Sequence, residues 1–483
     1  MTQQNRLPRA AALLFLAVAG LSGCAVGPDY ARPKVLNPER FKEAAASAGD
    51  SFSLETDWKV AEPDTVDTGP WWLVFDDALL NAFMPQLAMA NQDAAAARAN
   101  LRQARAAARE AAASFFPSVS GGGEVTRGQS GSRAPVGNAY RAQLSASWEL
   151  DLFGGTRRET ESAEALAEGS EAELAAVLLS MRAELAQNYF QLRSLDEQLR
   201  LYEQTIAAYE KSLAITRNQH AAGTVTRLDV VQAEAQYNNA RAQAVDLDLQ
   251  RRQTEHAIAA LLGLPPALLS IAPAPLDAQL PRIEAPLPAA LLERRPDVAA
   301  AERRMAAANA RIGVAQSAYF PVFSLTGSGG YSSGAFRDWF SLPNRVWSVG
   351  AGLAQSLFQG GRLLARTDQA VAAWEASVAT YRQSVLDAFR EVEDQLAATA
   401  LLEREEAMQR EALTAAREAE NLALSQYRGG IVNYLTVVSA QTTALTSARA
   451  SATLKGRRFM AAVALIRSLG GGWALNPARA ISF

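Results

Sequence analysis

One long unit occurs twice in the sequence, and this duplication restricts the chain to folds built from two equivalent halves. The segment Gly223–Ala233 matches Gly430–Ala440 without a gap. Two further pairs of segments repeat at a similar separation, namely Ser114–Ser118 with Ala318–Val322 and Leu152–Gly155 with Leu357–Gly361. Two copies of this length indicate a pseudo-symmetric protein, because a solenoid would show many short units. We therefore expect each half to supply the same strands and helices.

The N-terminus carries the features of an export signal. Arg6 and Arg9 precede an apolar run, Ala11–Leu21, which is shorter than the roughly 20 residues of a membrane-spanning helix. The run ends in Leu21–Cys24, which resembles the bacterial lipobox and predicts that Cys24 becomes the acylated first residue of the mature chain. Alanine, and not aspartate, follows Cys24, which favours the outer membrane as the destination of this lipoprotein.

The composition argues against several other classes of function. Cys24 is the only cysteine, so no disulfide can form within the chain. The formal net charge of −3 predicts no basic surface for nucleic acid. His220 and His256 lie far apart without a second ligand nearby, which predicts no metal site. Motifs for nucleotide binding or nucleophilic catalysis are also missing from the sequence. We therefore expect no cofactor other than the covalent lipid, and no enzymatic activity.

Proline usage predicts where long helices lie. No proline occurs between Pro135 and Pro265 or between Pro343 and Pro477, and proline in a helix interior costs about 3 kcal/mol. Apolar residues in both stretches recur every three or four positions, as expected for helices. At 1.5 Å per residue, a helix of this length would extend roughly 100 Å. Gly223 and Gly430 mark turns, Thr226 and Asp229 predict a capping box, and Asn433 can cap the second returning helix.

Strand signals occur at duplicated positions. Between Tyr140 and Leu152, apolar residues alternate with polar ones such as Arg141 and Gln143. This pattern is typical of a transmembrane strand with a polar lumen face, although a single segment of this kind also fits a soluble sandwich. We expect strands at about 118–128, 140–152, 322–332 and 346–357. Four strands cannot close a barrel, and open edges cannot lie in hydrocarbon, so two or three chains must associate to give eight or twelve strands.

Several motifs resemble the outer membrane efflux proteins of the TolC type, in particular the lipidated, NodT-like and OprM-like branch. The matching residues are Cys24–Tyr30 with Pro33, then Trp71, Trp72, Phe75 and Asp77, then Arg295–Val298, Ala300–Glu302, Tyr319–Pro321 and Tyr427–Thr436. The resemblance implies an α+β membrane protein in which a homotrimer forms a twelve-stranded β-barrel in the outer membrane. A periplasmic α-helical barrel would continue it, with an equatorial belt built from the termini and the inter-repeat segment.

The resemblance also implies a gate and a contact surface at the hairpin tips. Aspartates narrow the entrance of TolC-type channels, whereas this chain has Thr436 and Ser439 at the matching positions. Leu435 matches the apolar constriction of the OprM-like branch. Asp229 occupies the equivalent place in the first hairpin, where it could act as a gate residue or as a helix cap. The expected contacts with a periplasmic adaptor are Gly223, Thr226, Arg227, Arg428, Gly430, Asn433 and Tyr434.

The function implied is a passive exit duct of a tripartite efflux or secretion system. Its partners would be two further copies, outer membrane lipid, a periplasmic adaptor (membrane fusion protein) and an inner-membrane pump of the RND type. A periplasmic adaptor-type coiled-coil lipoprotein is the alternative; it would have one hairpin flanked by lipoyl-like β segments. A lipoprotein enzyme is a second, more distant alternative.

The predicted division is a signal peptide (1–23), a lipidated N-terminal segment (24–80), a first repeat (81–265), a proline-rich linker (266–296), a second repeat (297–472) and a tail (473–483). The helical hairpins are expected at about 157–262 and 362–469.

Overall fold

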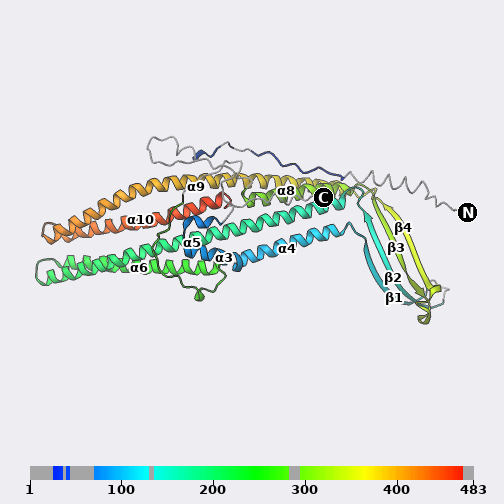
Figure 1. The fold of residues 1–483 in the computed structure, drawn as a ribbon, viewed down its shortest axis with the longest axis horizontal. Helices are drawn as coiled ribbons and strands as arrows, with labels where there is room; N and C mark the ends of the chain where they lie inside the picture. The colour runs from blue at the N-terminus through cyan, green and yellow to red at the C-terminus, as the bar shows by residue number, and fades with distance from the viewer. Residues whose placement is uncertain are drawn as a thin grey trace. The chain divides into compact units, whose positions relative to one another are not determined.

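The computed structural model describes residues 25–35, 38, 40–43, 70–129, 135–281 and 294–471. These residues divide into two compact units that cut across the sequence repeats. The first unit contains the described residues up to Lys34 together with Ala99–Glu171 and Ala300–Gln383, and the second contains the remainder. Each compact unit therefore draws on both repeats, whereas the division expected from the sequence followed the repeats along the chain. Figure 1 shows the order of the elements.

The first unit contains a four-stranded antiparallel sheet with strand order β1-β2-β3-β4. The strands are β1 (Ser118–Gly128), β2 (Gly137–Leu150), β3 (Val322–Ser333) and β4 (Arg345–Ala354). The two hairpins, one from each repeat, therefore join through β2 and β3. Within this described sheet, β1 and β4 each have one neighbour, so each leaves one edge with unpaired backbone groups.

The strand register separates an apolar face from a polar one. Directly opposed residues lie on the same face of a sheet, and successive residues alternate between faces. One row across the four strands is Val119, Ala146, Gly327 and Val349, and the adjacent row is Ser120, Ser145, Ser328 and Ser348. In the serine row, the hydroxyls of Ser328 and Ser348 are 2.8 Å apart. In these two rows, the alternation read from β2 in the sequence extends across all four strands.

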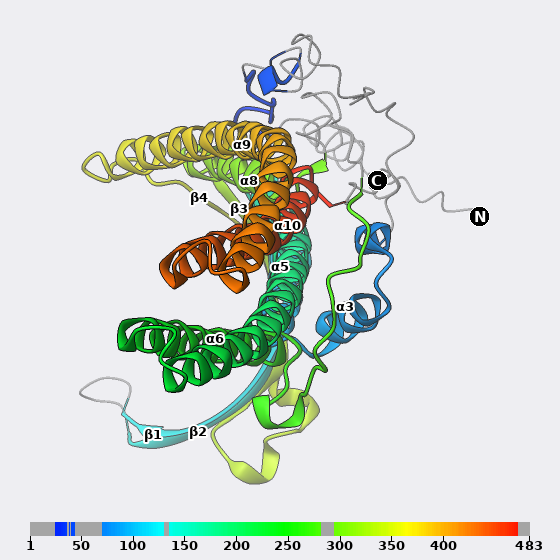
Figure 2. The ribbon, with the colours of Figure 1, turned by 90° about the vertical axis from the view of Figure 1, so that its left-hand side faces the viewer.

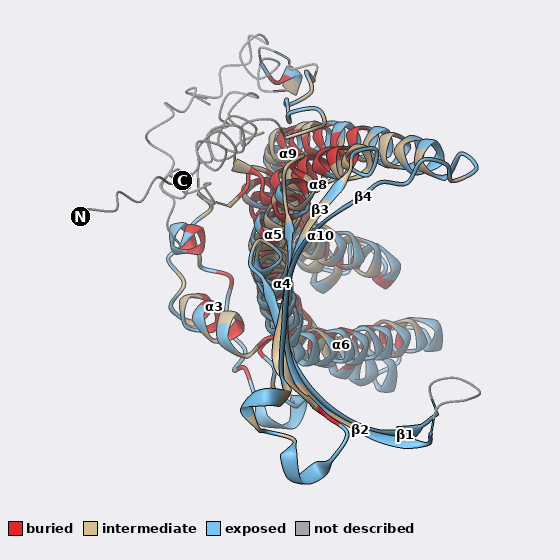
Figure 3. Cartoon of the chain, turned by 90° about the vertical axis from the view of Figure 1, so that its right-hand side faces the viewer, coloured by how far each residue is buried: buried red, intermediate tan, exposed pale blue. Residues whose placement is uncertain are grey.

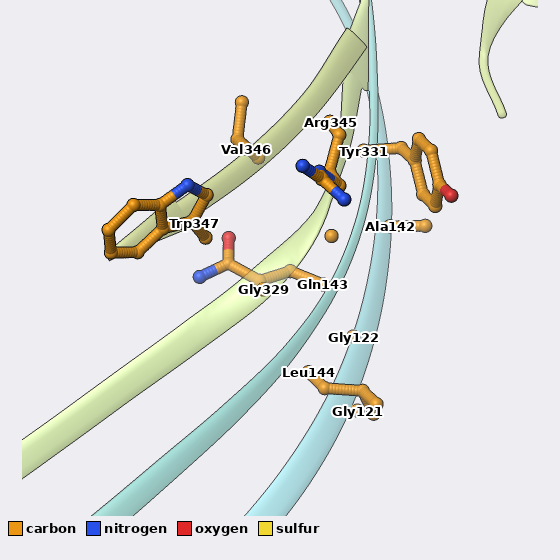
Figure 4. A pocket seen from close by; sticks show the side chains of 11 residues that line it. Gly121, Gly122, Ala142, Gln143, Leu144, Gly329, Tyr331, Arg345, Val346 and Trp347 are labelled. Atoms are coloured by element: carbon orange, nitrogen blue, oxygen red, sulfur yellow. The ribbon is translucent and has the colours of Figure 1, made fainter. Parts of the chain in front are cut away.

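Among the residues that the structure describes, most of the sheet is exposed on both faces. Val349 on the apolar face is 81% exposed and Leu144 is 63% exposed, and Figure 3 shows the strands mostly in the colours of exposed and intermediate residues. Soluble proteins rarely leave so much contiguous apolar surface in water. Figure 4 shows Ala142, Leu144 and Tyr331 on one side of the strands and Gln143 on the other, in agreement with the register.

Two long helical hairpins have matching lengths. Helices α5 (Gly155–Ala221) and α9 (Arg362–Arg428) each contain 67 residues, and α6 (Arg227–Leu261) and α10 (Tyr434–Ser468) each contain 35. Two helices of 22 residues complete the set, α4 (Gln92–Ala113) and α8 (Pro296–Ser317). No helix among the described residues is both long and apolar enough to cross a membrane.

The shorter helices meet the returning helices end to end in the second unit. Asn91, immediately before α4, donates from Nδ2 to the carbonyl of Leu261 at the end of α6 (3.0 Å). Arg295, immediately before α8, donates to the carbonyl of Ser468 at the end of α10 (3.2 Å). These contacts join α6 to α4 and α10 to α8, so that each pair extends as a composite helix.

The core of the second unit surrounds an aromatic cluster near the C-terminal ends of α6 and α10. Phe75, from the short helix Trp71–Phe75, packs against Phe190 of α5 with ring centroids 4.9 Å apart. Phe190 in turn packs against Phe459 of α10 (4.8 Å). Helix α3 (Ala78–Ala90) adds Leu80, Met84 and Leu87, all fully buried. The Trp71–Asp77 segment, singled out by its motif, is therefore a core element.

A segment of the inter-repeat linker is fixed by buried charges in the same unit. Asp196 is almost fully buried and accepts from Arg193 (3.0 Å) and Arg251 (2.6 Å). These arginines also donate to the carbonyls of Ala272 (2.9 Å) and Ile271 (2.6 Å). Buried ion pairs of this kind are satisfied only with such additional hydrogen bonds, so the linker and the ionic cluster depend on each other.

Candidate functional site at the hairpin tips

The first tip joins α5 to α6 through a glycine in the left-handed region. Gly223 has φ of +76°, its amide donates to the carbonyl of His220, and the amide of Thr224 donates to that of Gln219. These two bonds form a Schellman motif, which glycine favours because it has no Cβ. Thr226 and Asp229 then form the predicted capping box, with each side chain bonded to the other residue's backbone amide.

The second tip repeats this backbone geometry between α9 and α10. Gly430 has φ of +73°, its amide donates to the carbonyl of Tyr427, and the amide of Ile431 donates to that of Gln426. Asn433 caps α10 by accepting from the amide of Thr436 (3.1 Å). Both predicted helix starts are therefore present, each with the capping residue expected from the sequence.

In this structure the carboxylate of Asp229 takes part in the capping box at the start of α6. Its Oδ2 atom accepts from the amide of Thr226 (2.9 Å) and from the Thr226 hydroxyl (2.7 Å). Of the two interpretations of Asp229, the helix cap is the one that the hydrogen bonds support. Its counterpart in the second repeat, Thr436, donates from its hydroxyl to Asn433 (3.0 Å).

One tip residue differs from the expectation. The family resemblance predicted that Tyr434 contacts an adaptor, but the Tyr434 side chain is only 2% exposed. It packs against Tyr427 (ring centroids 5.3 Å apart), Leu213, Val230 and Val437. An aromatic ring at the first position of α10 can be buried because α5 lies against that turn. Tyr434 therefore forms part of the tip core, and its side chain is not exposed for an adaptor contact in this structure. The other predicted contact residues, Gly223, Thr226, Arg227, Arg428, Gly430 and Asn433, are exposed.

The predicted gate residues line one groove on the α9/α10 hairpin. Leu435, Thr436 and Ser439 are exposed and border a groove of about 620 Å³ together with Leu422 and Ala423 of α9. Leu435 is 55% exposed, whereas its neighbours Tyr434 and Val437 are buried. Leu435 is therefore not part of the tip core. Its exposed apolar side chain is available for contact with another surface.

Two polar contacts connect the hairpins near the tips, and the sequence analysis did not identify them. The Tyr427 hydroxyl donates to Gln219 Oε1 of α5 (2.9 Å), and the Tyr434 hydroxyl lies 3.4 Å from the Ser212 hydroxyl. Burial raises the pKa of both tyrosines above the ordinary value of 10.0, so both are neutral near pH 7 and able to donate. Tyr427 belongs to the recognised motif, but nothing in the sequence paired it with Gln219.

The N-terminal segment is anchored beside the sheet within the first unit. Cys24 lies outside the described residues, but the amide of Val26 donates to the carbonyl of Phe153 (3.1 Å). Arg158 donates to Asp29 (2.7 Å) and to the carbonyl of Gly27 (3.3 Å). Ala25 packs against Gly154, at which a Cβ would approach the Ala25 Cα to 2.7 Å. The residue after the predicted lipidation site therefore adjoins the junction between β2 and α5.

Comparison with known proteins agrees with this geometry. The family model for outer membrane efflux proteins matches residues 84–264 and 287–471. The pyoverdine export outer membrane protein OpmQ of Pseudomonas aeruginosa is 35% identical over 85% of this chain and 89% of its own length. Outer membrane protein OprJ of the same organism is 32% identical over 97% of both chains. The solved outer-membrane channel OprN superposes with a TM-score of 0.84 at 33% identity, over 93% of this chain and 100% of that one.

The architecture also decides between the classes considered from the sequence. An adaptor-type lipoprotein would have one helical hairpin, whereas the described residues contain two, together with a four-stranded sheet of paired hairpins. The family match covers both repeats, and the similarity to OprJ extends over nearly the whole chain. The chain therefore belongs to the outer membrane efflux protein family and is an outer-membrane component of an efflux system.

Proposed function

We propose that three copies of the chain form a passive exit channel that is anchored in the outer membrane by a lipid on Cys24. The observation that carries this proposal is the sheet, which has one apolar face, one polar face and two unpaired edges. Edge amides and carbonyls cannot remain unpaired in hydrocarbon, so the edges of β1 and β4 must pair with other copies. Three copies of four strands would give a twelve-stranded barrel with a polar lumen.

The helical hairpins support coupling to other proteins of an efflux system. In this proposal their exposed tips contact a periplasmic adaptor, which connects the channel to an inner-membrane pump of the RND type. The exposed residues Arg227 and Arg428 at the two tips suit a polar contact of this kind. The channel itself would then supply the exit route, and the pump would supply the energy.

The cargo class proposed is small molecules, chosen by the pump. Relatives named for the export of pyoverdine, for solvent efflux and for toluene efflux are 31 to 35% identical to this chain. Such similar values for such different cargo suggest that the duct contributes little selectivity of its own.

Lipid attachment at Cys24 fits the anchoring of the N-terminal segment. Residues 25–29 bond to Phe153 and Arg158 at the junction between strand and helix, which is where a barrel would leave the membrane. A diacyl chain on the preceding residue would therefore enter the same leaflet that surrounds the barrel. Replacing Cys24 by serine should abolish labelling with radioactive palmitate while the protein stays in the outer membrane fraction. Release of the variant into the soluble periplasm would show that the strands do not insert.

Membrane insertion is tested by placing a charge on each face of β2. Leu144 lies on the apolar face and Ser145 on the polar face. Leu144→Arg should reduce trimer yield, because arginine facing lipid near the midplane costs about 2 to 4 kcal/mol. Ser145→Arg, the matched control, should assemble normally and alter single-channel conductance in planar bilayers. Equal trimer yields for the two variants would contradict the assigned faces.

A further inference from the structure

The loop between β3 and β4 folds over the apolar face of the sheet. Figure 2 shows this loop in yellow-green on the convex side of the strands. Tyr140 and Tyr331 lie on the apolar face by the strand register. Tyr140 packs against Phe336 and Trp339 of the loop, with ring centroids 5.6 Å apart in both pairs. Tyr331 packs against Phe340 (5.5 Å). These rings form a loop aromatic cluster at one end of the apolar face.

The position of the loop aromatic cluster fits one interface of a membrane. Tyr140 of the cluster and Trp148 lie on the same face of β2, because an even number of positions separates them. At about 3.3 Å per residue and a tilt of about 40°, the two rings differ by roughly 20 Å in depth. Outer membrane barrels have an apolar band of about 25 Å between two aromatic girdles. Helix α5 follows the strand end near Trp148, so in the proposed orientation the loop aromatic cluster lies at the outer leaflet.

The charged residues of the strands differ between the two faces. In the described strands, the polar face carries Glu124, Arg141 and Glu149, whereas the charged residues of the apolar face are both arginines, Arg127 and Arg345. Both of these arginines lie near the loop end of their strands, where a barrel would meet the lipid headgroups. An arginine is tolerated there because its long side chain can extend to polar groups at the interface. The apolar face is therefore positively charged at its outer end.

The loop adds a further cation beside the aromatic rings. Arg337 lies next to Asp338 in the loop, and Arg345 directly opposes Tyr331 in the strand register. Both arginines are exposed, and no described residue forms an ion pair or a side-chain hydrogen bond with either guanidinium group. The loop backbone is held in place, because Asn344 donates from Nδ2 to the carbonyl of Asp338 (2.7 Å). Two guanidinium groups are therefore available for an anion outside the protomer.

We propose that Arg337 and Arg345 bind a phosphate group of lipopolysaccharide, the phosphorylated glycolipid of the outer leaflet, while Phe336 and Phe340 contact its acyl chains. This inference rests on the proposed function, which places the loop end of the sheet at the outer leaflet. Guanidinium groups bind phosphate through paired, charge-assisted hydrogen bonds. Phe336 is 69% exposed and Phe340 is 66% exposed beside these arginines. A free phosphate ion needs no apolar surface, whereas a lipid occupies the cations and the exposed rings together.

The experiment titrates the full-length protein, freed of co-purified lipid in detergent, with purified lipopolysaccharide. Arg337→Gln/Arg345→Gln should weaken binding about tenfold or more, because it removes charge-assisted hydrogen bonds to phosphate. Arg345→Gln and Arg141→Gln form the matched pair, since each removes one arginine, from the apolar and the polar face respectively. The first should weaken binding and the second should bind as the wild-type protein does. Dephosphorylated lipopolysaccharide should bind the wild-type protein as weakly as the intact lipid binds the double variant.

The outcomes separate this inference from the proposed function. Equal affinities of the Arg345→Gln and Arg141→Gln variants would overturn the lipid site, as would equal binding of intact and dephosphorylated lipopolysaccharide to the wild-type protein. Calorimetry with inorganic phosphate alone should detect no binding. Phosphate binding that is lost in the double glutamine variant would assign the arginines to a free anion and also overturn the inference. The proposed function fails on a different result, namely equal trimer yields for Leu144→Arg and Ser145→Arg.

Discussion

The tip between α5 and α6 and the tip between α9 and α10 share one backbone geometry but bury different side chains. Both turn through a glycine with positive φ and both begin the returning helix with a side-chain cap. Their counterpart residues Arg227 and Tyr434 nevertheless differ, since Arg227 is exposed and Tyr434 is 2% exposed. Tyr434 packs against Leu213 of α5 and Val230 of α6, whereas the side chain of Arg227 is exposed.

This difference shows how a duplicated chain distributes its contacts. The contact between α5 and the second hairpin is formed inside one protomer. It includes the buried Tyr434 of α10, whose hydroxyl lies 3.4 Å from that of Ser212, and a hydrogen bond from Tyr427 of α9 to Gln219. In the proposed trimer, exposed apolar side chains of the protomer such as Val245 and Met408 would instead meet a neighbouring copy. A junction that forms during folding can include polar groups that need accurate placement, while one formed by association depends mainly on apolar burial. The following predictions test this contrast, beginning with the largest expected effect on stability.

Truncating the buried tip residue should destabilise the hairpin far more than truncating its counterpart. Tyr434→Ala removes a fully packed ring and should lower the free energy of unfolding by about 3 to 5 kcal/mol. Arg227→Ala should change it by about 0.5 kcal/mol or less, as surface substitutions usually do. Chemical unfolding followed by circular dichroism measures both. Similar losses for the two variants would mean that the tips are energetically equivalent.

The two helix caps should contribute about equally, because the tips share their backbone geometry. Thr226→Ala and Asn433→Ala should each cost about 1 kcal/mol. Hydrogen exchange at the first turns of α6 and α10 reports the local loss at each tip. A Thr226→Ala/Asp229→Ala variant should lose less than the sum of its single variants, since both residues belong to one capping box. Strict additivity would show that the two capping bonds act independently.

Removing one hydrogen bond between the hairpins should have a smaller effect on stability but a measurable effect on the channel. Tyr427→Phe leaves the ring in place and deletes the bond to Gln219, at a cost of about 0.5 to 1.5 kcal/mol. If the bond holds the tips closed, single-channel conductance in planar bilayers should rise. Gln219→Leu, which removes the same bond from the other side, should give the same change. Unchanged conductance in both variants would limit the bond to a structural role.

Replacing the two counterpart leucines should barely affect protomer stability and should separate their roles. Leu435→Ala should raise conductance, because three leucines at the symmetry axis would close the entrance by packing and dewetting. Leu228→Ala, at the exposed counterpart position in the first hairpin, should leave the conductance of assembled trimers unchanged. A change in cation selectivity in Asp229→Ala, with no change in Leu435→Ala, would favour an acidic gate instead.

The sequence by itself determined the duplication, the four strands and the two long hairpins, because each depends on local signals. Strand alternation placed the polar and apolar rows, the absence of proline allowed 67-residue helices, and Thr226, Asp229 and Asn433 marked the helix starts. These features follow from backbone preferences within a few residues. The motifs spanning both repeats also identified the family, which the similarity to known proteins confirms.

Only the tertiary structure decided which of these residues face each other. Burial of Tyr434 depends on α5, which lies more than two hundred residues away in the sequence, and the helix-start signals before it are of the same kind as those before the exposed Arg227. The Tyr427–Gln219 bond and the ionic cluster of Asp196, Arg193 and Arg251, which binds the linker, likewise join distant segments. Side-chain environment at such positions is set by which helices become neighbours, and that depends on the packing of the whole chain.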